Sequence, residues 1–173
     1  MRLTRLRIAG LRILAQVDIE PAPRINLLRG ANGAGKTSVL EAIHLLGFGR
    51  SFRVAGRDAL LRRDGGPIEL FAEIAGGGSV APTHRLGLVC DARQWQARID
   101  GEPVRSLASL LGHCPVVCFE PGSHALIGGG SELRRRFLDW SLFHVEHAFL
   151  PLWRRYQRAL QQRNALLKAG ARD

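Results

Sequence analysis

The chain has 173 residues, of which 46% are apolar, so one folded domain with a core is expected and wholesale disorder is excluded. Its longest apolar runs are too short to cross a bilayer, and we expect no association with a membrane. The formal net charge of +10 favours a polyanionic partner, with nucleic acid the first candidate. The alternative is that an arginine-rich composition reflects genomic base bias.

The N-terminus and the cysteines both favour a cytoplasmic protein. The first residues, MRLTRLRIAGLRILAQ, are basic and apolar like a secretory signal, but Arg5, Arg7 and Arg12 interrupt any apolar stretch of the required kind. The sequence holds three cysteines, which are Cys90, Cys114 and Cys118. No second Cys/His pair follows at zinc-finger spacing, so we expect small buried residues in a reducing compartment.

Apolar periodicity and turn residues predict the elements of the chain. In chain order these are strands at 2–9, 13–19 and 25–29, helices at 36–46 and 57–63, strands at 67–75, 83–90 and 93–99, a helix at 105–111, a strand at 114–119 and helical residues from 131 to about 168. Gly47 and Gly49 are expected to end the first helix, Asp100-Gly101 to form a hairpin turn, and Pro151 to separate two helices. Together the strands within 67–99 predict an antiparallel sheet inserted after the first helix.

The eight residues 30–37 read GANGAGKT and match the phosphate-binding pattern G-x-x-x-x-G-K-[ST] at each fixed position. Glycines allow the backbone to approach phosphates closely with its N–H groups pointing inward, and the start of the following helix adds partial positive charge. Lys36 is expected to reach the β- and γ-phosphates, and Thr37 to offer its hydroxyl to Mg²⁺. We therefore predict binding of ATP and Mg²⁺. The predicted binding residues are Gly30, Ala31, Asn32, Gly33, Ala34, Gly35, Lys36, Thr37 and Ser38.

Three polar residues near this motif have two interpretations each. Asn32 could hold the γ-phosphate or an attacking water, or it could be a turn residue that tolerates the left-handed conformation. Arg50 and Arg53, in GRSFR, could contact DNA or nucleotide phosphates. Alternatively, either arginine could form an ion pair with Asp58 or Glu41.

Other charged or polar residues are expected to have structural roles. His44 lies in the amphipathic helix and is expected to be packed rather than catalytic. The run Arg134–Arg136 is expected to form a solvated helix face, because a helix presents only part of such a run to one partner. Asp139 is expected to anchor an arginine.

Three separated blocks of the chain resemble the RecF family of bacterial recombination-repair ATPases. They are GANGAGKTSVLEAIHLLGFGRSFR at 30–53, ELRRRFLDWSLFHVEHAFLPLWRRYQRALQQRNALL at 132–167, and LTRLRIAGLRIL at the N-terminus. Arg12 lies where the family commonly has an arginine after an aromatic residue, although Leu11 replaces that aromatic residue here.

The resemblance implies an α/β fold of the P-loop NTPase class. Residues 1–130 would form the first lobe of an ABC-type ATPase head with a mixed or antiparallel sheet, and residues 131–173 would begin a helical arm. The resemblance also implies that Arg12 contacts the base or phosphates of the nucleotide, the alternative being a surface arginine. Members of the family bind ATP, dimerise around it, bind DNA and act with the partner RecR. The implied function is ATP-dependent binding of gapped, duplex or single-stranded DNA in replication and recombinational repair, where it helps recombinase loading.

One departure from the family pattern limits the expected activity. Neither an LSGGQ-like signature nor an acidic strand end follows the arm helix in this sequence. We therefore expect the N-terminal part of a longer protein, with no catalytic residue of its own, weak nucleotide binding at best and negligible hydrolysis. Two other functions remain open: a small-molecule kinase, which the antiparallel strands disfavour, and a basic DNA-binding module whose P-loop is vestigial.

Overall fold

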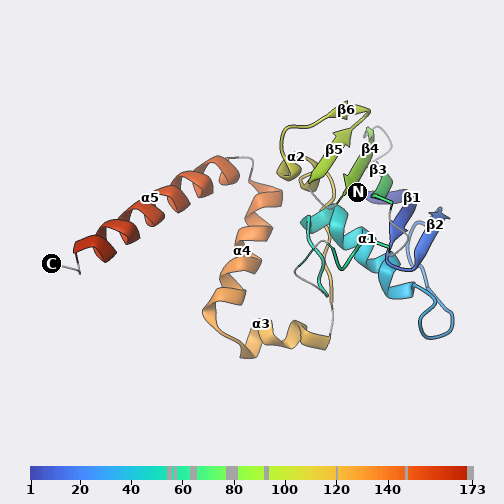
Figure 1. The fold of residues 1–173 in the computed structure, drawn as a ribbon, viewed down its shortest axis with the longest axis horizontal. Coiled ribbons are helices and arrows are strands. Elements are labelled where there is room, and N and C mark those ends of the chain that lie inside the picture. The colour runs from blue at the N-terminus through green and yellow to red at the C-terminus, as the bar shows by residue number, and fades with distance from the viewer. Residues whose placement is uncertain are drawn as a thin grey trace. The chain divides into compact units, whose positions relative to one another are not determined.

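The chain folds as two units, Met1–Cys118 and Phe119–Asp173, in a computed structural model (Figure 1). The described residues are 1–53, 56, 58–62, 66–76, 82–91, 94–119, 121–146 and 148–170. The first unit contains the sheet and two helices, and the second is helical. The boundary after Gly130 that the family resemblance implies stays a prediction.

A six-stranded antiparallel sheet forms the framework of the first unit. Its strands are β1 (Arg2–Leu11), β2 (Leu14–Ile19), β3 (Ile68–Ala75), β4 (Thr83–Cys90), β5 (Trp95–Ile99) and β6 (Glu102–Pro103). They lie in the order β2-β1-β3-β4-β5-β6, and every neighbouring pair is antiparallel. The antiparallel sheet predicted within 67–99 is therefore confirmed. The predicted turn at Asp100-Gly101 joins β5 to β6, with φ values of 53° and 90°.

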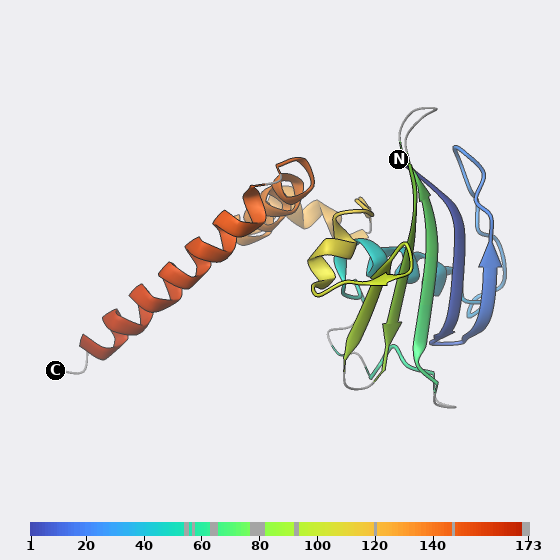
Figure 2. The ribbon, with the colours of Figure 1, turned by 90° about the horizontal axis from the view of Figure 1, so that it is seen from above.

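Two helices, α1 (Lys36–Phe48) and α2 (Leu107–Leu111), lie on one face of this sheet (Figure 2). Alternate strand residues face them, because side chains in a strand point to opposite faces in turn. The central strands contribute Leu6, Ile8, Leu70, Ala72, Leu86 and Leu88, each at most 2% exposed. Ala42, Leu45 and Leu46 of α1 have no exposed surface. Each buried leucine or isoleucine stabilises this packing by roughly 1.5–3 kcal/mol, so α1 and the loop before it are firmly placed.

The two glycines near the end of α1 have different roles. Gly49 ends the helix as predicted, with a φ of 65° and its N–H donating to the carbonyl oxygen of Leu45 at 2.8 Å. Gly47 does not end the helix but lies within it. A Cβ at Gly47 would lie 2.5 Å from Val116 Cγ2 and 2.8 Å from the carbonyl oxygen of Cys114. Glycine at this position therefore lets α1 pack closely against Cys114 and Val116, and it does not form a turn.

Two predicted strands are absent from the described sheet. The segment 25–29 is irregular, with Ile25 and Leu27 exposed at 88% and 70%. The segment 114–119 is also irregular, with Cys114 buried and Val117 59% exposed. Apolar composition predicts burial, but a strand also needs a neighbour for its backbone hydrogen bonds. None of the six described strands pairs with either segment.

A short helix is predicted at 57–63, of which the structure describes residues 58–62. For these residues the prediction is wrong. Residues 58–60 form a turn, and Leu61 makes an isolated bridge with Leu11. The backbone N–H of Arg12 donates to the carbonyl oxygen of Leu60 at 2.9 Å. Pairing with the end of β1 therefore replaces the local helical hydrogen bonds.

The second unit contains a 3₁₀ turn (Pro121–His124), α3 (Ala125–Gly128), α4 (Ser131–Val145) and α5 (Phe149–Gly170). The long helical region predicted from 131 is confirmed as two helices, but Pro151 does not separate them. It lies in the first turn of α5, where backbone N–H groups have no partner within the helix. The missing N–H of proline therefore costs no helical hydrogen bond there.

Polar contacts in the second unit correct one prediction and confirm another. Asp139 Oδ2 accepts a hydrogen bond from the indole N–H of Trp153 at 3.1 Å, which links α4 to α5. The prediction that Asp139 anchors an arginine is therefore wrong. The run Arg134–Arg136 is exposed as predicted, and Arg135 and Arg136 pair with Glu132 at 2.9 and 3.0 Å.

Two of the three cysteines are buried. Cys90 and Cys114 are buried thiols as predicted, but Cys118 is exposed. Burial raises the pKa of the Cys114 thiol to about 11, which keeps it protonated and unreactive. Among the helices that the structure describes, not one combines the length and apolarity of a membrane span.

Candidate functional site

The loop that leads into α1 adopts backbone conformations that glycine supplies. The φ values are 156° at Gly30, 83° at Gly33 and 93° at Gly35. At Gly35 a Cβ would also lie 2.5 Å from Leu14 Cδ2. The first turn of α1, whose residues are all described, has neither a side-chain cap nor an acidic residue. Its N–H groups and its partial positive charge are therefore available to an anion.

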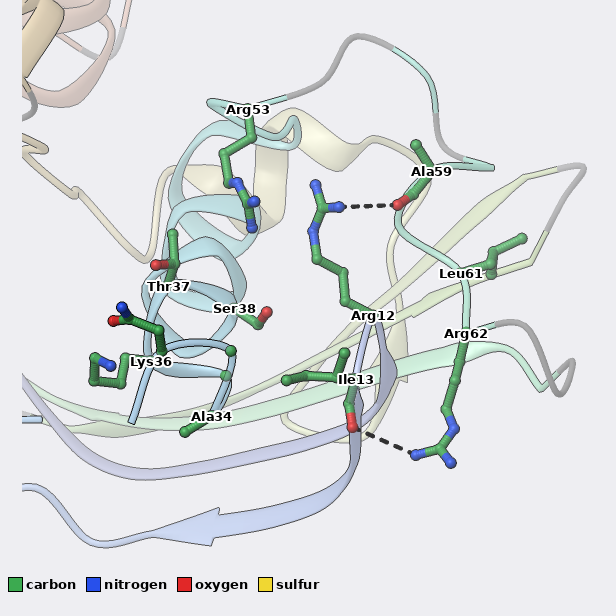
Figure 3. A pocket seen from close by; sticks show the side chains of 13 residues that line it. Arg12, Ile13, Ala34, Lys36, Thr37, Ser38, Arg53, Ala59, Leu61 and Arg62 are labelled. Atoms are coloured by element: carbon green, nitrogen blue, oxygen red, sulfur yellow. Dashed lines mark hydrogen bonds between the residues drawn. The ribbon is translucent and has the colours of Figure 1, made fainter. Parts of the chain in front are cut away.

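Lys36 extends back along this loop (Figure 3). Its Nζ donates hydrogen bonds to the carbonyl oxygens of Gly30 and Ala31, each at 2.8 Å. Thr37 is exposed at the start of the helix, and Ser38 is only 4% exposed. Two backbone carbonyl groups of the loop thus hold the ammonium group of Lys36.

The loop forms one wall of a cavity of about 1020 Å³. The turn between β1 and β2 and the residues that follow α1 form the other walls (Figure 3). Of the predicted binding residues, Arg12, Arg53 and those at 32–38 line this cavity. Gly30 and Ala31 lie in the loop as the acceptors of Lys36. The structure thus brings together a motif and two arginines that are distant in sequence.

A buried carboxylate, Glu41, contacts two of the three arginines that line this cavity. Glu41 lies in α1 with no exposed surface. Arg12 donates from Nη2 to Oε1 at 2.9 Å and from Nε to Oε2. The Ser51 hydroxyl donates to Oε1, and Arg53 Nη1 lies 3.9 Å from Oε2. The alternative interpretation of Arg53, an ion pair with Glu41, is therefore confirmed.

Arg12 combines a left-handed backbone conformation with a further side-chain contact. It has a φ of 53°, a left-handed conformation that costs a residue other than glycine roughly 1–2 kcal/mol. Its Nη1 donates to the carbonyl oxygen of Ala59 at 3.2 Å, as Figure 3 shows. Because glycine would adopt this conformation without strain, an arginine here indicates that its side chain is used.

The charge state of Glu41 follows from its surroundings. Burial alone raises the pKa of Glu41, but the hydrogen bonds from Arg12 and Ser51 and the charges of Arg12 and Arg53 outweigh it. The pKa of Glu41 is therefore lower than its ordinary value, and the carboxylate stays ionised at neutral pH. The same contact raises the pKa of Arg12 through the hydrogen bond with Glu41.

An Arg12→Met substitution is expected to reverse the sign of the contribution that Glu41 makes to the pH dependence of folding stability. With Glu41 at a lowered pKa, its stabilising contribution is present above the ordinary carboxyl pKa and is lost as the pH falls through the folded-state value. Without Arg12, burial dominates, so the folded-state pKa rises and stability falls as the pH increases. In urea unfolding, the variant should have a lower free energy of unfolding than wild type. This deficit should grow toward pH 7, where it reaches about 3 kcal/mol.

The matched control for that measurement is Arg7→Met. Arg7 pairs with Asp18 on the outer face of the sheet at 3.0 Å, with 53% of its side chain exposed. Exposed pairs contribute little, so this variant should remain close to wild type at each pH. A constant offset between Arg12→Met and wild type across the pH series would contradict the assigned charge state of Glu41.

A Gly35→Ala substitution is expected to abolish the anion-binding shape of the loop and to destabilise the first unit by about 2 kcal/mol. The added methyl combines a φ of 93° with the close approach to Leu14. Gly33→Ala is the control, because its φ of 83° is also unfavourable but no atom lies within 4 Å of its Cβ. Thermal unfolding should rank Gly35→Ala as the less stable variant, and equal midpoints would contradict the packing.

Two other predicted residues lie elsewhere or have a packing role. Arg50 does not line the cavity; its carbonyl oxygen accepts a hydrogen bond from His44 Nδ1 at 2.7 Å. His44 is 7% exposed and stacks on Phe48 with ring centroids 4.2 Å apart. The packed role predicted for His44 is thus confirmed. Asn32 lines the cavity from the loop, and both of its interpretations remain.

Four residues of the cavity wall are absent from the sequence prediction. They are Ile13, Ala59, Leu61 and Arg62. Arg62 Nη1 lies 3.5 Å from the carbonyl oxygen of Ile13. Backbone pairing of residues 60–61 with the end of β1 brings this segment to the site, and no periodicity in the sequence signals that pairing.

Comparisons with known proteins agree with this geometry. A family model described as an AAA domain matches residues 5–77. A protein of Xanthomonas oryzae pv. oryzae (strain MAFF 311018), DNA replication and repair protein RecF, is 57% identical over 99% of this chain and 48% of its own length. The protein of the same name from Pseudomonas paraeruginosa (strain DSM 24068 / PA7) is 43% identical over 100% of this chain and 47% of its own length.

A solved structure gives the same result for the fold. The recombination mediator protein RecF-ATP in the RecFOR pathway superposes with a TM-score of 0.82 and 26% identity, covering 96% of this chain and 46% of that protein. The predicted α/β P-loop fold with an antiparallel sheet, similar to an ABC-type ATPase head, is thereby confirmed. The chain spans about half the length of the curated relatives it matches, and with 43–57% identity along nearly all of its own residues it belongs to the RecF family.

Proposed function

We propose that this chain binds ATP in the cavity beside α1, as the nucleotide-binding part of an ATP-dependent DNA-binding protein of replication and recombinational repair. One observation carries the proposal. A glycine loop, the free start of a helix, an ammonium group and two arginines all face one cavity of about 1020 Å³. Four kinds of phosphate-binding feature line this cavity, and an isolated glycine-rich turn would supply only the loop.

The individual roles follow from donor geometry. The N–H groups of the loop and of the first helical turn are donors for the phosphates, with Gly33 and Gly35 keeping the approach open. Lys36 would exchange its two carbonyl acceptors for β- and γ-phosphate oxygens. Arg12 uses three of its five N–H donors in the contacts described above, so two remain for a nucleotide.

Mg²⁺ fits the same site. The Thr37 hydroxyl supplies a hard oxygen ligand at the start of α1, beside the predicted position of the phosphates. Among the described residues, no group of three or more histidine, cysteine or acidic side chains could hold a metal ion by itself. A bound Mg²⁺ would neutralise phosphate charge, and its further ligands would be phosphate oxygens and water.

Hydrolysis would require groups besides those described in the cavity. Glu41 accepts hydrogen bonds from Arg12 and Ser51, so it is not placed to activate a water molecule. Lys36 and Thr37 are proposed to bind phosphate and metal, and neither is assigned as a general base. We propose that the cavity is one half of a composite site, completed by further residues of the full-length protein and by a second subunit.

The wider role is proposed from the family and from charge. The relatives carry the name DNA replication and repair protein, and the solved structure is described as a recombination mediator in the RecFOR pathway. For this chain we propose gapped, duplex or single-stranded DNA as the polyanion that its charge of +10 favours. We further propose a cytoplasmic location, a RecR-like repair partner and a homodimer that forms with ATP, helping recombinase loading.

Dimerisation and DNA binding by the full-length protein test this function. Wild type should dimerise and bind duplex DNA when ATP and Mg²⁺ are added, whereas Lys36→Ala should do neither. Equal dimerisation by the two proteins would remove the P-loop from the mechanism. DNA binding that ignores ATP and falls steeply with salt would support the basic module instead. Phosphate transfer from labelled ATP to a small acceptor would support the kinase.

A further inference from the structure

We propose that Glu41 is a positioning residue for nucleotide binding, which fixes Arg12 and Arg53 on the cavity wall before a polyphosphate arrives. The inference rests on the proposed ATP site and assigns a role to a residue one helical turn beyond Thr37. Glu41 itself does not line the cavity, since both of its carboxylate oxygens face arginines and a serine. Its effect on a ligand would therefore pass through those side chains.

The contacts of Glu41 draw three segments of the chain together. Arg12 comes from the turn between β1 and β2, Glu41 from α1, and Ser51 and Arg53 from the residues that follow α1. Ser51 Oγ donates to Glu41 and accepts a hydrogen bond from the backbone N–H of Arg53 at 2.9 Å. The carboxylate therefore sets both the side chain of Arg12 and the backbone turn that presents Arg53.

A negative charge is needed between these two arginines because their like charges repel each other. Arg12 is 18% exposed and Arg53 is 44% exposed, so water screens the first much less than the second. Without a carboxylate, the two guanidinium groups would move apart toward solvent. Preorganised donors bind an anion better than mobile ones, because the loss of side-chain freedom has already occurred.

The positioning role and simple electrostatics predict opposite changes in ATP affinity when Glu41 loses its charge. Removing the charge of Glu41 adds one unit of positive charge near the cavity, and charge alone would then tighten ATP binding. Positioning predicts weaker binding, because the arginines lose their orientation. The sign of the change therefore separates the two explanations.

The experiment compares Glu41→Gln, Glu41→Asp and wild type in the full-length protein, with ATP and adenosine as the two probes in equilibrium titrations. Glu41→Gln should weaken ATP binding about tenfold and adenosine binding less than about twofold, since adenosine offers the arginines no phosphate. Glu41→Asp keeps the charge and should lie between wild type and Glu41→Gln. Glu69→Gln is the control, since Glu69 is exposed on the sheet.

A second variant keeps the test valid if Glu41→Gln does not fold. Ser51→Ala removes the link to the Arg53 turn and leaves the pair between Arg12 and Glu41 intact. It should weaken ATP binding about threefold without changing adenosine binding. Tighter or unchanged ATP binding by these variants would overturn the positioning role, and so would equal losses for ATP and adenosine, which a purely structural role predicts. Failure of wild type to bind ATP, or normal binding by Lys36→Ala, would instead overturn the proposed ATP site itself.

Discussion

A Lys36→Ala substitution is expected to weaken ATP binding by at least about 100-fold. Hydrogen bonds to charged groups contribute about 1.5–3 kcal/mol each, and the loss of two such bonds to phosphate oxygens gives that factor or more. The ammonium group also donates to the carbonyl oxygens of Gly30 and Ala31, so its removal leaves the loop less well fixed. Calorimetric titration with ATP and Mg²⁺ measures the change directly.

The chain offers a matched control for this result. Lys168 is the second of two lysines in the sequence and is exposed near the end of α5. Lys168→Ala removes the same charge and side chain outside the cavity, and it should leave ATP affinity unchanged. Similar losses for the two variants would show that net charge, rather than the P-loop, governs binding.

A Leu45→Ala substitution is expected to destabilise the first unit by about 3 kcal/mol. Leu45 lies in α1 with no exposed surface, among the side chains that pack the helix against the sheet. Its truncation removes buried apolar area and leaves a cavity in that layer, and the surrounding structure relaxes only partly. Since α1 carries Lys36, Thr37 and Glu41, the same packing holds the candidate site in place.

Leu40→Ala in the same helix separates packing from helix propensity. Leu40 is 51% exposed, and leucine and alanine are both strong helix formers, so this variant should change the unfolding free energy by less than about 1 kcal/mol. Urea unfolding of the 173-residue chain compares the two. Equal destabilisation would mean that α1 does not present the side chains of Ala42 and Leu45 to the sheet as described.

Local signals in the sequence predict much of the fold. Alternation of apolar residues identifies β1, β3 and β4, because each strand of this sheet buries one face. The phosphate-binding loop is also predicted in place, since its glycines and its lysine have fixed spacing. These features depend on residues that lie within a few positions of one another along the chain.

The errors concern contacts between distant residues. The apolar residues at 25–29 and 114–119 predict strands, yet neither segment pairs with the described sheet. The helix predicted at 57–63 yields to backbone pairing with the end of β1, which no local pattern encodes. Gly47 predicts a helix end from its identity alone, whereas its role comes from Val116, far along the chain.

In the candidate site, too, local sequence signals predict some residues, whereas contacts between distant residues place the others. The loop residues are predicted from the motif, and Arg12 from the resemblance to the RecF family. The sequence presents Glu41 only as an alternative partner for Arg50 or Arg53, because its bonds to Arg12 and Ser51 join residues 29 and 10 positions apart. Placement of Arg62 and Leu61 on the cavity wall likewise depends on tertiary pairing.

The central claim is that the phosphates of ATP bind beside Lys36, and covalent labelling tests it most directly. A lysine-reactive acyl phosphate of ATP transfers its acyl group to a lysine close to the bound phosphates. With two lysines in the sequence, mass spectrometry can assign the modified residue without ambiguity. We predict acylation of Lys36, suppressed by excess ATP with Mg²⁺, and only background modification of Lys168. Equal labelling of the two lysines, or labelling of Lys36 that excess ATP does not suppress, would contradict the assignment.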